Sequence, residues 1–314
     1  MNDSIDVTFV VAAYNTRETI AQTILSALSQ IGVSVEILII DDCSTDDTVE
    51  VVMGFSDPRV RLIRMAENRG PGAARNSGIA QARGRWIAVL DSDDEILADR
   101  SARMLARAKR LSAQIVVDNL MVSQAGSQPI AMFSQNTLEQ RPILSLAEFI
   151  DSNVLFKSTF NFGYLKPMFS REFLEGHRLT FDESLRIGED YILLASALAC
   201  GGLCAIEPIP GYVYNIREGS ISRVLKINHV DAMVEADHRF TSQYRLDGMA
   251  SVAQGRRTRS LEDARAFLIF VENIKNRSLT GSIKAALQAP YALRHLRMPV
   301  EKRLRNLLKR GNRH

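Results

Sequence analysis

The sequence predicts an α/β fold with a mostly parallel central sheet flanked by helices. Between residues 6 and 100, runs rich in Val and Ile alternate with segments of helical apolar spacing, as in consecutive βαβ units. The apolar runs are nearly continuous, which is typical of strands buried on both faces. With 314 residues, 46% of them hydrophobic and 24% charged, the chain can bury a sizeable core.

The first hundred residues contain four predicted strands with helical segments between them. Asn15, followed three residues later by Glu18, predicts a capping box at the start of the first helix. Ser44 and Asp47 mark the start of the second helix. The small residues of 71–82 are compatible with a third helix. The predicted strands span 6–13, 35–40, 60–63 and 86–90.

The later part of the chain mixes strands and helices less regularly. Residues 120–145 have weak periodicity and predict a hairpin or loop, and Pro167 makes its strand an edge strand or a bend. From about residue 227 the pattern is helical only, so we expect an α/β domain over 1–225 and a helical extension over 226–314. The other predicted helices are 100–111, 145–153 and 191–199, the last opened by 188–190, and the other strands are 115–119, 165–169 and 211–216.

Composition limits the classes of protein that fit. No segment approaches the roughly 20 apolar residues that span a bilayer, and the acidic N-terminus lacks the basic region of a signal peptide, so we expect a cytoplasmic protein. Three cysteines without a histidine partner predict buried free thiols. Residues 294–314 carry eight Lys or Arg against one Glu, a formal charge of +7, while the remainder sums to −4.

Four groups of candidate site residues lie beyond the ends of the predicted strands. Ligands of open α/β sheets bind beyond the carboxyl ends of the strands, so one shared site is predicted. Taken singly, each group also fits a plainer interpretation as a turn, a helix cap or a solvated arginine. The candidates are Ala13, Tyr14 and Asn15 after the first strand, Asp42 after the second, Arg75 after the third, and Asp91, Ser92 and Asp93 after the fourth.

The chemistry of these side chains suits a nucleotide, its phosphates and a metal ion. Tyr14 offers a flat face on which a base can stack, and the Asp42 carboxylate can accept a hydrogen bond from a base or ribose. Arg75 follows two glycines that permit close backbone approach, and it can neutralise a phosphate. The carboxylates of 91–94 suit a hard cation such as Mg²⁺, with phosphate oxygens and water completing its shell.

Together these motifs resemble those of the family 2 glycosyltransferases, which have the nucleotide-diphospho-sugar transferase (GT-A) fold. The resemblance covers about residues 5–225, and the chain is similar to the glucosyltransferases of rhizobial succinoglycan assembly. It implies a metal-dependent, inverting enzyme that uses a UDP-sugar, with UDP-glucose expected. The segments that carry the resemblance are 10–15, 39–46, 68–76, 90–94, 188–190 and 214–222.

The resemblance also implies roles for individual residues. Tyr14 and Asp42 would hold the uracil, and Arg75 would lie near the base or the diphosphate. Asp91 would reach the ribose or a metal-bound water, and is therefore a second metal candidate. The remaining implied roles are nucleotide binding by Ala13, Asn15 and Ser92, direct coordination of Mg²⁺ or Mn²⁺ by Asp93, and general base catalysis by Asp190.

Departures and alternatives bear on this interpretation. Ala12 stands where family members often have proline, and the Gln-x-x-Arg-Trp motif of processive synthases is absent because Trp86 is the only tryptophan. Transfer of one sugar at a time is therefore expected.

A dehydrogenase would need a glycine-rich turn after the first strand, which is missing. A sugar nucleotidyltransferase and a catalytically silent carbohydrate-binding scaffold subunit stay open as alternatives.

The acceptor and the basic tail are linked in this interpretation. We expect a lipid-linked saccharide acceptor in bacterial exopolysaccharide or surface polysaccharide synthesis, at the inner face of the cytoplasmic membrane, and no nucleic-acid partner. Leucines recur at helical spacing over 293–308 among basic residues, which predicts an interfacial helix on anionic lipid, kinked or divided at Pro299. The same pattern also fits a helix packed on the catalytic domain.

Overall fold

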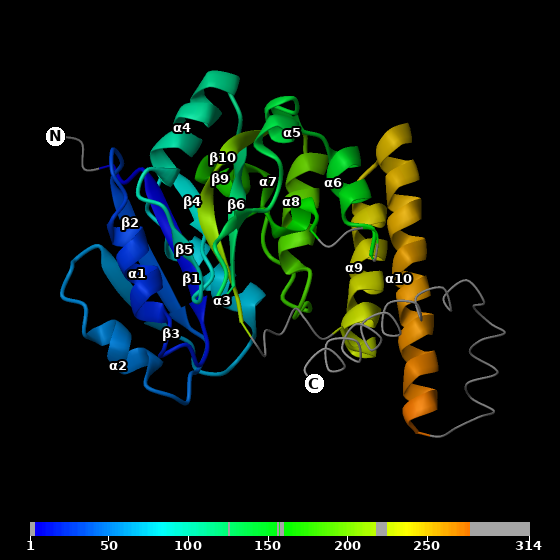
Figure 1. The fold of residues 1–314 in the computed structure, drawn as a ribbon, viewed down its shortest axis with the longest axis horizontal. Helices are drawn as coiled ribbons and strands as arrows, with labels where there is room; N and C mark the ends of the chain where they lie inside the picture. The colour runs from blue at the N-terminus through cyan, green and yellow to red at the C-terminus, as the bar shows by residue number, and fades with distance from the viewer. Residues whose placement is uncertain (1–3, 125, 156, 158–159, 218–224, 277–314) are drawn as a thin grey trace, which may run out of the picture.

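The computed structural model describes residues 4–124, 126–155, 157, 160–217 and 225–276. The described residues form one ten-stranded mixed sheet with helices on both faces, which confirms the predicted α/β class (Figure 1). Strand order is β3-β2-β1-β4-β9-β6-β10-β5, with β7 paired to β6 and β8 paired to β10.

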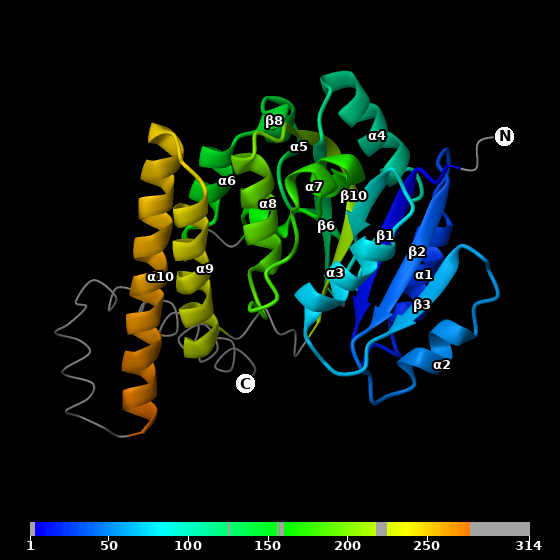
Figure 2. The same ribbon diagram turned by 180° about the vertical axis from the view of Figure 1, so that it is seen from behind.

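The N-terminal half of the sheet is parallel, as the alternating pattern predicted. It contains β1 (Val7–Ala13), β2 (Val35–Asp41), β3 (Val60–Arg64) and β4 (Trp86–Val89), all in parallel pairs. Every residue of β2 is buried, because helices cover both faces. Figures 1 and 2 show α1 (Ile20–Leu28) and α3 (Pro71–Gln81) on opposite sides of this half, while α2 (Thr48–Met53) lies near its edge.

The second half of the sheet is mixed. β9 (Met168–Ser170) runs antiparallel between β4 and β6 (Ile115–Gln124), and β10 (Cys204–Ile216) is parallel to β6. Of the two alternatives predicted from Pro167, an edge strand or a bend, the edge strand is wrong, because β9 lies between β4 and β6. The proline lies just before β9, where no ladder N–H is needed, and its carbonyl accepts the Val89 N–H at 3.4 Å.

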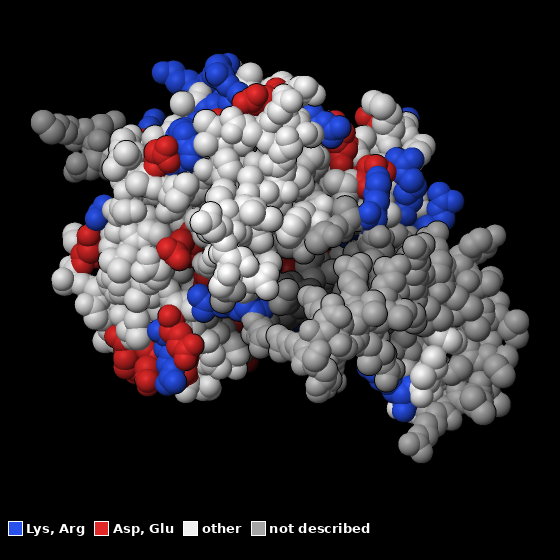
Figure 3. Space-filling model, in the orientation of Figure 1, with Lys and Arg blue, Asp and Glu red and all other residues white. Residues whose placement is uncertain are grey.

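Short elements and helices complete this half. The region predicted as a hairpin or loop holds β7 (Ile130–Ala131), α5 (Gln135–Glu139) and β8 (Ile143–Leu144). The cationic helix α4 (Arg100–Leu111) packs on β6 and β10, and basic side chains gather over it at the top of Figure 3. The remaining elements are β5 (Glu95–Ile96), α6 (Leu146–Ser152), η1 (Phe162–Tyr164), α7 (Arg171–His177) and α8 (Glu189–Ala199).

The predicted capping box of the first helix is wrong. Helix α1 begins at Ile20, and Asn15 lies outside it with a φ of 54°. The Asn15 side-chain oxygen accepts the N–H of Thr45 at 2.8 Å, so it joins the loops after β1 and β2 instead of capping a helix. A capping box does form at α6, where Ser145 and Glu148 bind each other's backbone N–H groups.

The helical region predicted beyond residue 226 is present as α9 (Ile227–Gln243) and α10 (Gly248–Lys275). It packs on the preceding part: Arg257 of α10 donates to the carbonyl of Asn153 at 2.9 Å, and its guanidinium lies 3.5 Å from the centre of the Tyr191 ring. The predicted domain limits at 225 and 226 stay a prediction. The basic tail lies outside the described residues. No helix within the described ranges is long and apolar enough to cross a bilayer.

Candidate active site

The loops that follow β1 and β2 meet at one edge of the sheet. Ala13 pairs with Asp41 at the ends of these parallel strands, so the next residues of both emerge side by side. The Asn15 N–H donates to the Ser44 hydroxyl at 3.0 Å. Tyr14, which lies between Ala13 and Asn15 in the chain, is 47% exposed and available for stacking on a ligand.

Asp42 is buried and shapes the loop that leads into α3. Its carboxylate accepts the N–H groups of Arg69 at 2.8 Å and Gly70 at 2.7 Å. Gly70 has a φ of 91°, and a Cβ there would lie 2.2 Å from the Arg186 side chain. Asp42 therefore has a structural role in addition to any contact with a nucleotide.

The acidic loop after β4 is held from one side by α1. The Thr19 hydroxyl donates to the Ser92 carbonyl at 2.7 Å, and the Thr23 hydroxyl donates to the Asp94 carbonyl at 2.8 Å. Both threonines are buried. Residues 91–94 are thus fixed by backbone contacts, which leaves their carboxylates for other partners.

Strand β10 holds the same loop from the other side. The Asp94 carboxylate accepts the Tyr212 hydroxyl and the Asn215 N–H, each at 2.8 Å. Tyr212 also accepts the Asp91 N–H at 3.1 Å, and the Asn215 amide donates to the Asp93 carbonyl at 3.1 Å. The Asp94 carboxylate therefore has a structural role, and its contacts with β10 help to position Asp91 and Asp93.

Two cations join Asp91 to Asp190 in a closed ring of charges. Arg75 contacts one oxygen of each carboxylate, at 2.8 Å from Asp91 and 3.0 Å from Asp190. Lys166 contacts the other oxygen of each, at 2.6 Å from Asp91 and 3.3 Å from Asp190. Arg75 also binds Glu189 at 2.8 Å. The acidic loop after β4 and the start of α8 are thereby brought into one site.

The charges of the ring set the ionisation of its members. Burial acts to raise the pKa of Asp91, but the Lys166 and Arg75 cations lower it to about 2, so this carboxylate is ionised at neutral pH. Burial and the charge of Asp91 raise the pKa of Asp93. Burial and the charge of Asp190 raise the pKa of Glu189. The two carboxylates with raised pKa values are those whose charged forms are least favoured in this site.

The side chains of this site can hold a divalent ion only if a bound substrate supplies some of the coordinating oxygens. Within the described ranges, no group of three or more His, Cys, Asp or Glu side chains is arranged to hold a metal. Both oxygens of Asp91 are engaged by cations, whereas no ion pair to the Asp93 carboxylate occurs among the described residues. Mg²⁺ commonly takes one or two carboxylates and completes its shell with substrate phosphates, which suits Asp93.

Several residues predicted for the site lie together in the structure, and other contacts at this place were not predicted. Arg75, Asp91 and Asp190, predicted separately, are in direct contact. Lys166 and Tyr212 were missed. The one sequence signal for Lys166 was a charged residue beside Pro167 in an otherwise apolar run, and nothing local distinguished Tyr212 within its strand.

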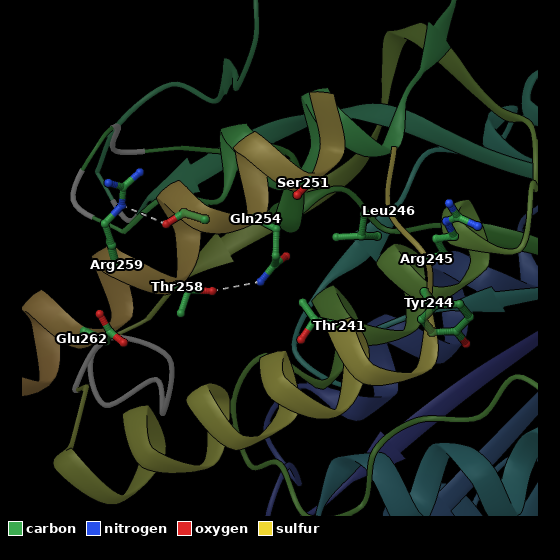
Figure 4. Close-up of a pocket in the computed structure, with 10 residues that line it drawn as sticks. Thr241, Tyr244, Arg245, Leu246, Ser251, Gln254, Thr258, Arg259 and Glu262 are labelled. Atoms are coloured by element: carbon green, nitrogen blue, oxygen red, sulfur yellow. Dashed lines mark hydrogen bonds between the residues drawn. The ribbon is translucent and has the colours of Figure 1, made fainter. Parts of the chain in front are cut away.

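A separate pocket of about 500 Å³ lies between α9 and α10 (Figure 4). Thr241, Gln254 and Thr258 are among the residues that line it, and Gln254 extends into it between the two helices. None of the predicted site residues borders this pocket. It is therefore distinct from the charged site at the sheet edge.

Comparison with known proteins identifies the family. The sequence model described as Glycosyl transferase family 2 matches residues 8–173, which is more than half of the chain. The chain belongs to glycosyltransferase family 2. The matched residues include Asp42, Arg75 and the whole acidic loop after β4, so the predicted resemblance is confirmed.

Two curated relatives of this family 2 glycosyltransferase match nearly its full length. It is 59% identical to the succinoglycan biosynthesis protein ExoO of Rhizobium meliloti (strain 1021), over 97% of this chain and 88% of that protein. It is 32% identical to the succinoglycan biosynthesis protein ExoU of the same organism, over 92% and 84% of the two chains.

Solved structures show the same fold. The S. aureus TarS fragment 1–349 in complex with UDP matches with a TM-score of 0.64 at 14% identity, covering 93% of this chain and 92% of that chain. The same fragment in complex with UDP-GlcNAc matches with a TM-score of 0.61 at 16% identity, with 90% of each chain covered. The GT-A glycosyltransferase fold predicted from the sequence is confirmed.

Proposed function

We propose that this enzyme transfers a single sugar from a UDP-sugar to a lipid-linked saccharide, with inversion, in bacterial exopolysaccharide synthesis of the succinoglycan type. The observation that carries the proposal is the ring of Arg75, Asp91, Lys166 and Asp190, because it joins a donor-side acidic loop to a carboxylate suited to act on an acceptor. The 59% identity to a succinoglycan biosynthesis protein supports the biosynthetic setting.

The donor site is assigned to the strand-end loops. The exposed ring of Tyr14 stacks on the uracil, and Asp42 accepts a hydrogen bond from it at the floor of the site. Ala13, Asn15 and Ser92 line the nucleotide. UDP-glucose is the first candidate donor, because a relative that matches 28% of this chain at 46% identity is named as a glucosyltransferase that uses UDP-Glc.

Asp93 is assigned as the protein ligand of a divalent ion, Mg²⁺ or Mn²⁺, and Asp91 as a carboxylate directed to the ribose or to a metal-bound water. A bound ion supplies positive charge that stabilises the diphosphate as it leaves. Burial raises the pKa of Asp93 because its charged form is poorly solvated, and a cation at this position relieves that cost.

Asp190 is assigned as the general base. The acceptor oxygen attacks the anomeric carbon, the bond from that carbon to the phosphate oxygen breaks, UDP leaves, and the acceptor proton passes to Asp190. The side chain of Asp190 is 22% exposed, so a substrate hydroxyl can reach it. A single displacement of this kind inverts the anomeric centre.

The acceptor is assigned as a lipid-linked saccharide, which would place the enzyme at the inner face of the cytoplasmic membrane. The same partial relative is named for transfer to a diphosphoundecaprenol-linked sugar. The cationic helix α4 and the basic tail are the segments whose charge suits an anionic lipid surface.

A donor panel tests the proposal. The purified enzyme is incubated with UDP-sugars and a lipid-linked saccharide, with Mn²⁺ or with a chelator. We expect metal-dependent transfer from one donor and an NMR coupling constant that reports a β linkage from a UDP-α-sugar. Retention of configuration contradicts the mechanism. In a parallel incubation with UTP and a sugar 1-phosphate, formation of a UDP-sugar with release of pyrophosphate supports a nucleotidyltransferase instead. Absence of transfer and hydrolysis with every donor supports a silent scaffold.

A further inference from the structure

Lys166 lies at the centre of the site without an assigned role. Its ammonium group contacts Asp91 at 2.6 Å and Asp190 at 3.3 Å, and its side chain is only 10% exposed. We propose that Lys166 is a positioning residue that holds the base Asp190 in register with the donor-binding loop. This inference rests on the proposed function, in which Asp190 accepts the acceptor proton.

The backbone of Lys166 is anchored, and its ammonium group is held by low exposure and by its two carboxylate partners. The Lys166 carbonyl accepts a hydrogen bond from the fully buried Arg100 at 2.9 Å, and Arg100 is itself paired with the fully buried Asp118. Pro167 follows and restricts the backbone further. A lysine anchored in this way presents its charge at one place, which is what positioning a partner requires.

The geometry assigns different tasks to the two cations of the ring. Arg75 binds the first oxygen of Asp190 and also Glu189, so it holds the start of α8 as a unit. Lys166 binds the second oxygen of Asp190 through its longer contact, at 3.3 Å against 2.6 Å to Asp91. A carboxylate oxygen has two lone pairs, so this second oxygen can keep Lys166 and still receive the acceptor hydroxyl.

The ring also makes the position of the base Asp190 depend on Asp91, which lies in the proposed donor-binding loop. Each cation touches both carboxylates, so a displacement of Asp91 or Asp190 changes the contacts of both cations. Placement of the attacking hydroxyl within a fraction of an ångström has large effects on rate. Lys166 therefore contributes to turnover through Asp190, and because Arg75 still holds Asp91 at 2.8 Å, its effect on nucleotide affinity is expected to be smaller.

A double-mutant cycle tests this assignment. Lys166→Met, Asp190→Asn and the double variant are compared by kcat at saturating substrates, after the donor panel has established wild-type transfer. Loss of a positioned base costs about 10²–10⁴-fold, and Lys166→Met should cost less than Asp190→Asn. In the Asp190→Asn background, Lys166→Met should cause no further loss, because both changes act through one group.

Further variants separate positioning from binding and from folding. Lys166→Arg, which keeps the charge, should recover part of the lost kcat, and Lys157→Met, which removes an exposed lysine paired with Asp151 at 2.6 Å, should keep wild-type activity. UDP affinity in Mn²⁺, measured by calorimetry, should fall much less than kcat in Lys166→Met, because Arg75 still holds Asp91. Retained binding also shows that the variant is folded; if it is unfolded, Lys166→Gln takes its place in the cycle. Losses that multiply in the cycle, or a parallel loss of UDP affinity, would overturn the proposal in favour of a diphosphate ligand. Because transfer by the wild type is measured first, these outcomes bear on Lys166 and not on the proposed function.

Discussion

Three aspartates of one loop have different environments and therefore different tasks. Asp91 is paired with two cations and is held ionised, while Asp94 is hydrogen-bonded to Tyr212 and Asn215. Burial and the charge of Asp91 raise the pKa of Asp93 above its usual range. No ion pair to the Asp93 carboxylate occurs among the described residues, so a cation brought in with a substrate would interact most favourably with this carboxylate.

Asp93→Ala should remove Mn²⁺-dependent UDP binding and transfer while leaving the fold intact. The raised pKa of Asp93 also predicts a pH dependence. A carboxylate must lose its proton to bind a metal, so wild-type Mn²⁺–UDP affinity should weaken as the pH falls. Calorimetry with UDP and Mn²⁺ measures both effects. Asp231→Ala, at a half-exposed carboxylate on α9, is the matched control. Unchanged UDP affinity in Asp93→Ala would remove this residue from the metal site.

At the residue scale, the sequence was informative where chemistry follows a recognisable motif. Arg75, Asp91 and Asp190 stand in such motifs, and the structure brings them together. Lys166 could not be predicted in the same way, because its partners are 75 and 24 positions away in the chain and depend on where β9 lies in the sheet.

At the scale of elements, β10 links the end of the sheet to the acidic loop. Its Tyr212 is fully buried, donates to Asp94 and accepts from the Asp91 N–H. The Arg100 guanidinium lies 5.2 Å from the centre of the same ring. The Tyr212 side chain therefore ties β10 to the loop that carries the proposed metal ligand Asp93.

Tyr212→Phe should destabilise the protein and loosen that loop. The change leaves a buried carboxylate and a backbone N–H without their shared partner, which costs about 1–3 kcal/mol of unfolding free energy. Urea denaturation measures the loss, and UDP calorimetry should show weaker binding. Tyr164→Phe is the control, since the Tyr164 ring packs on Tyr214 and no hydrogen bond of its hydroxyl occurs within the described ranges. Equal losses for both variants would contradict the proposed link.

Local patterns predicted most elements and failed where tertiary contacts compete with them. The parallel strands β1, β2 and β4 follow from apolar runs that are mostly buried, while the edge strand β3 is only half-buried. The insertion of β9 between β4 and β6 could not be inferred, because three residues carry little pattern and their partners are distant in sequence. The side chain of Asn15 had two possible partners, and the neighbouring loop supplied the better one.

At the scale of the molecule, the two C-terminal helices are part of the packed body. Phe240, Ala250 and Ala253 belong to the main hydrophobic core, and Arg257 binds Asp237 of α9 as well as the Asn153 carbonyl. Breaking a buried ion pair of this kind costs several kcal/mol, so these helices are expected to be needed for folding. The formal charge of +7 over residues 294–314 lies beyond them.

Vesicle co-sedimentation tests whether that charge serves membrane binding. The full chain should bind vesicles that contain anionic lipid, with up to about 1 kcal/mol from each basic residue near the surface, and added salt should weaken the binding. A chain ending at Pro290 keeps all described residues and should bind less. Equal binding of the two chains, or no binding by either, would assign the tail to packing or to another partner.

The charge ring carries a consequence for the history of this enzyme. Its four members come from α3, from the loop after β4, from the segment before β9 and from the start of α8, and each touches two others. A single substitution at any of them leaves its two partners with one counter-charge in place of two, so change at one position is expected to be accompanied by change at another. Among homologous sequences, positions 75, 91, 166 and 190 are therefore expected to covary. An alignment in which position 166 drifts independently of positions 91 and 190 would contradict this shared dependence.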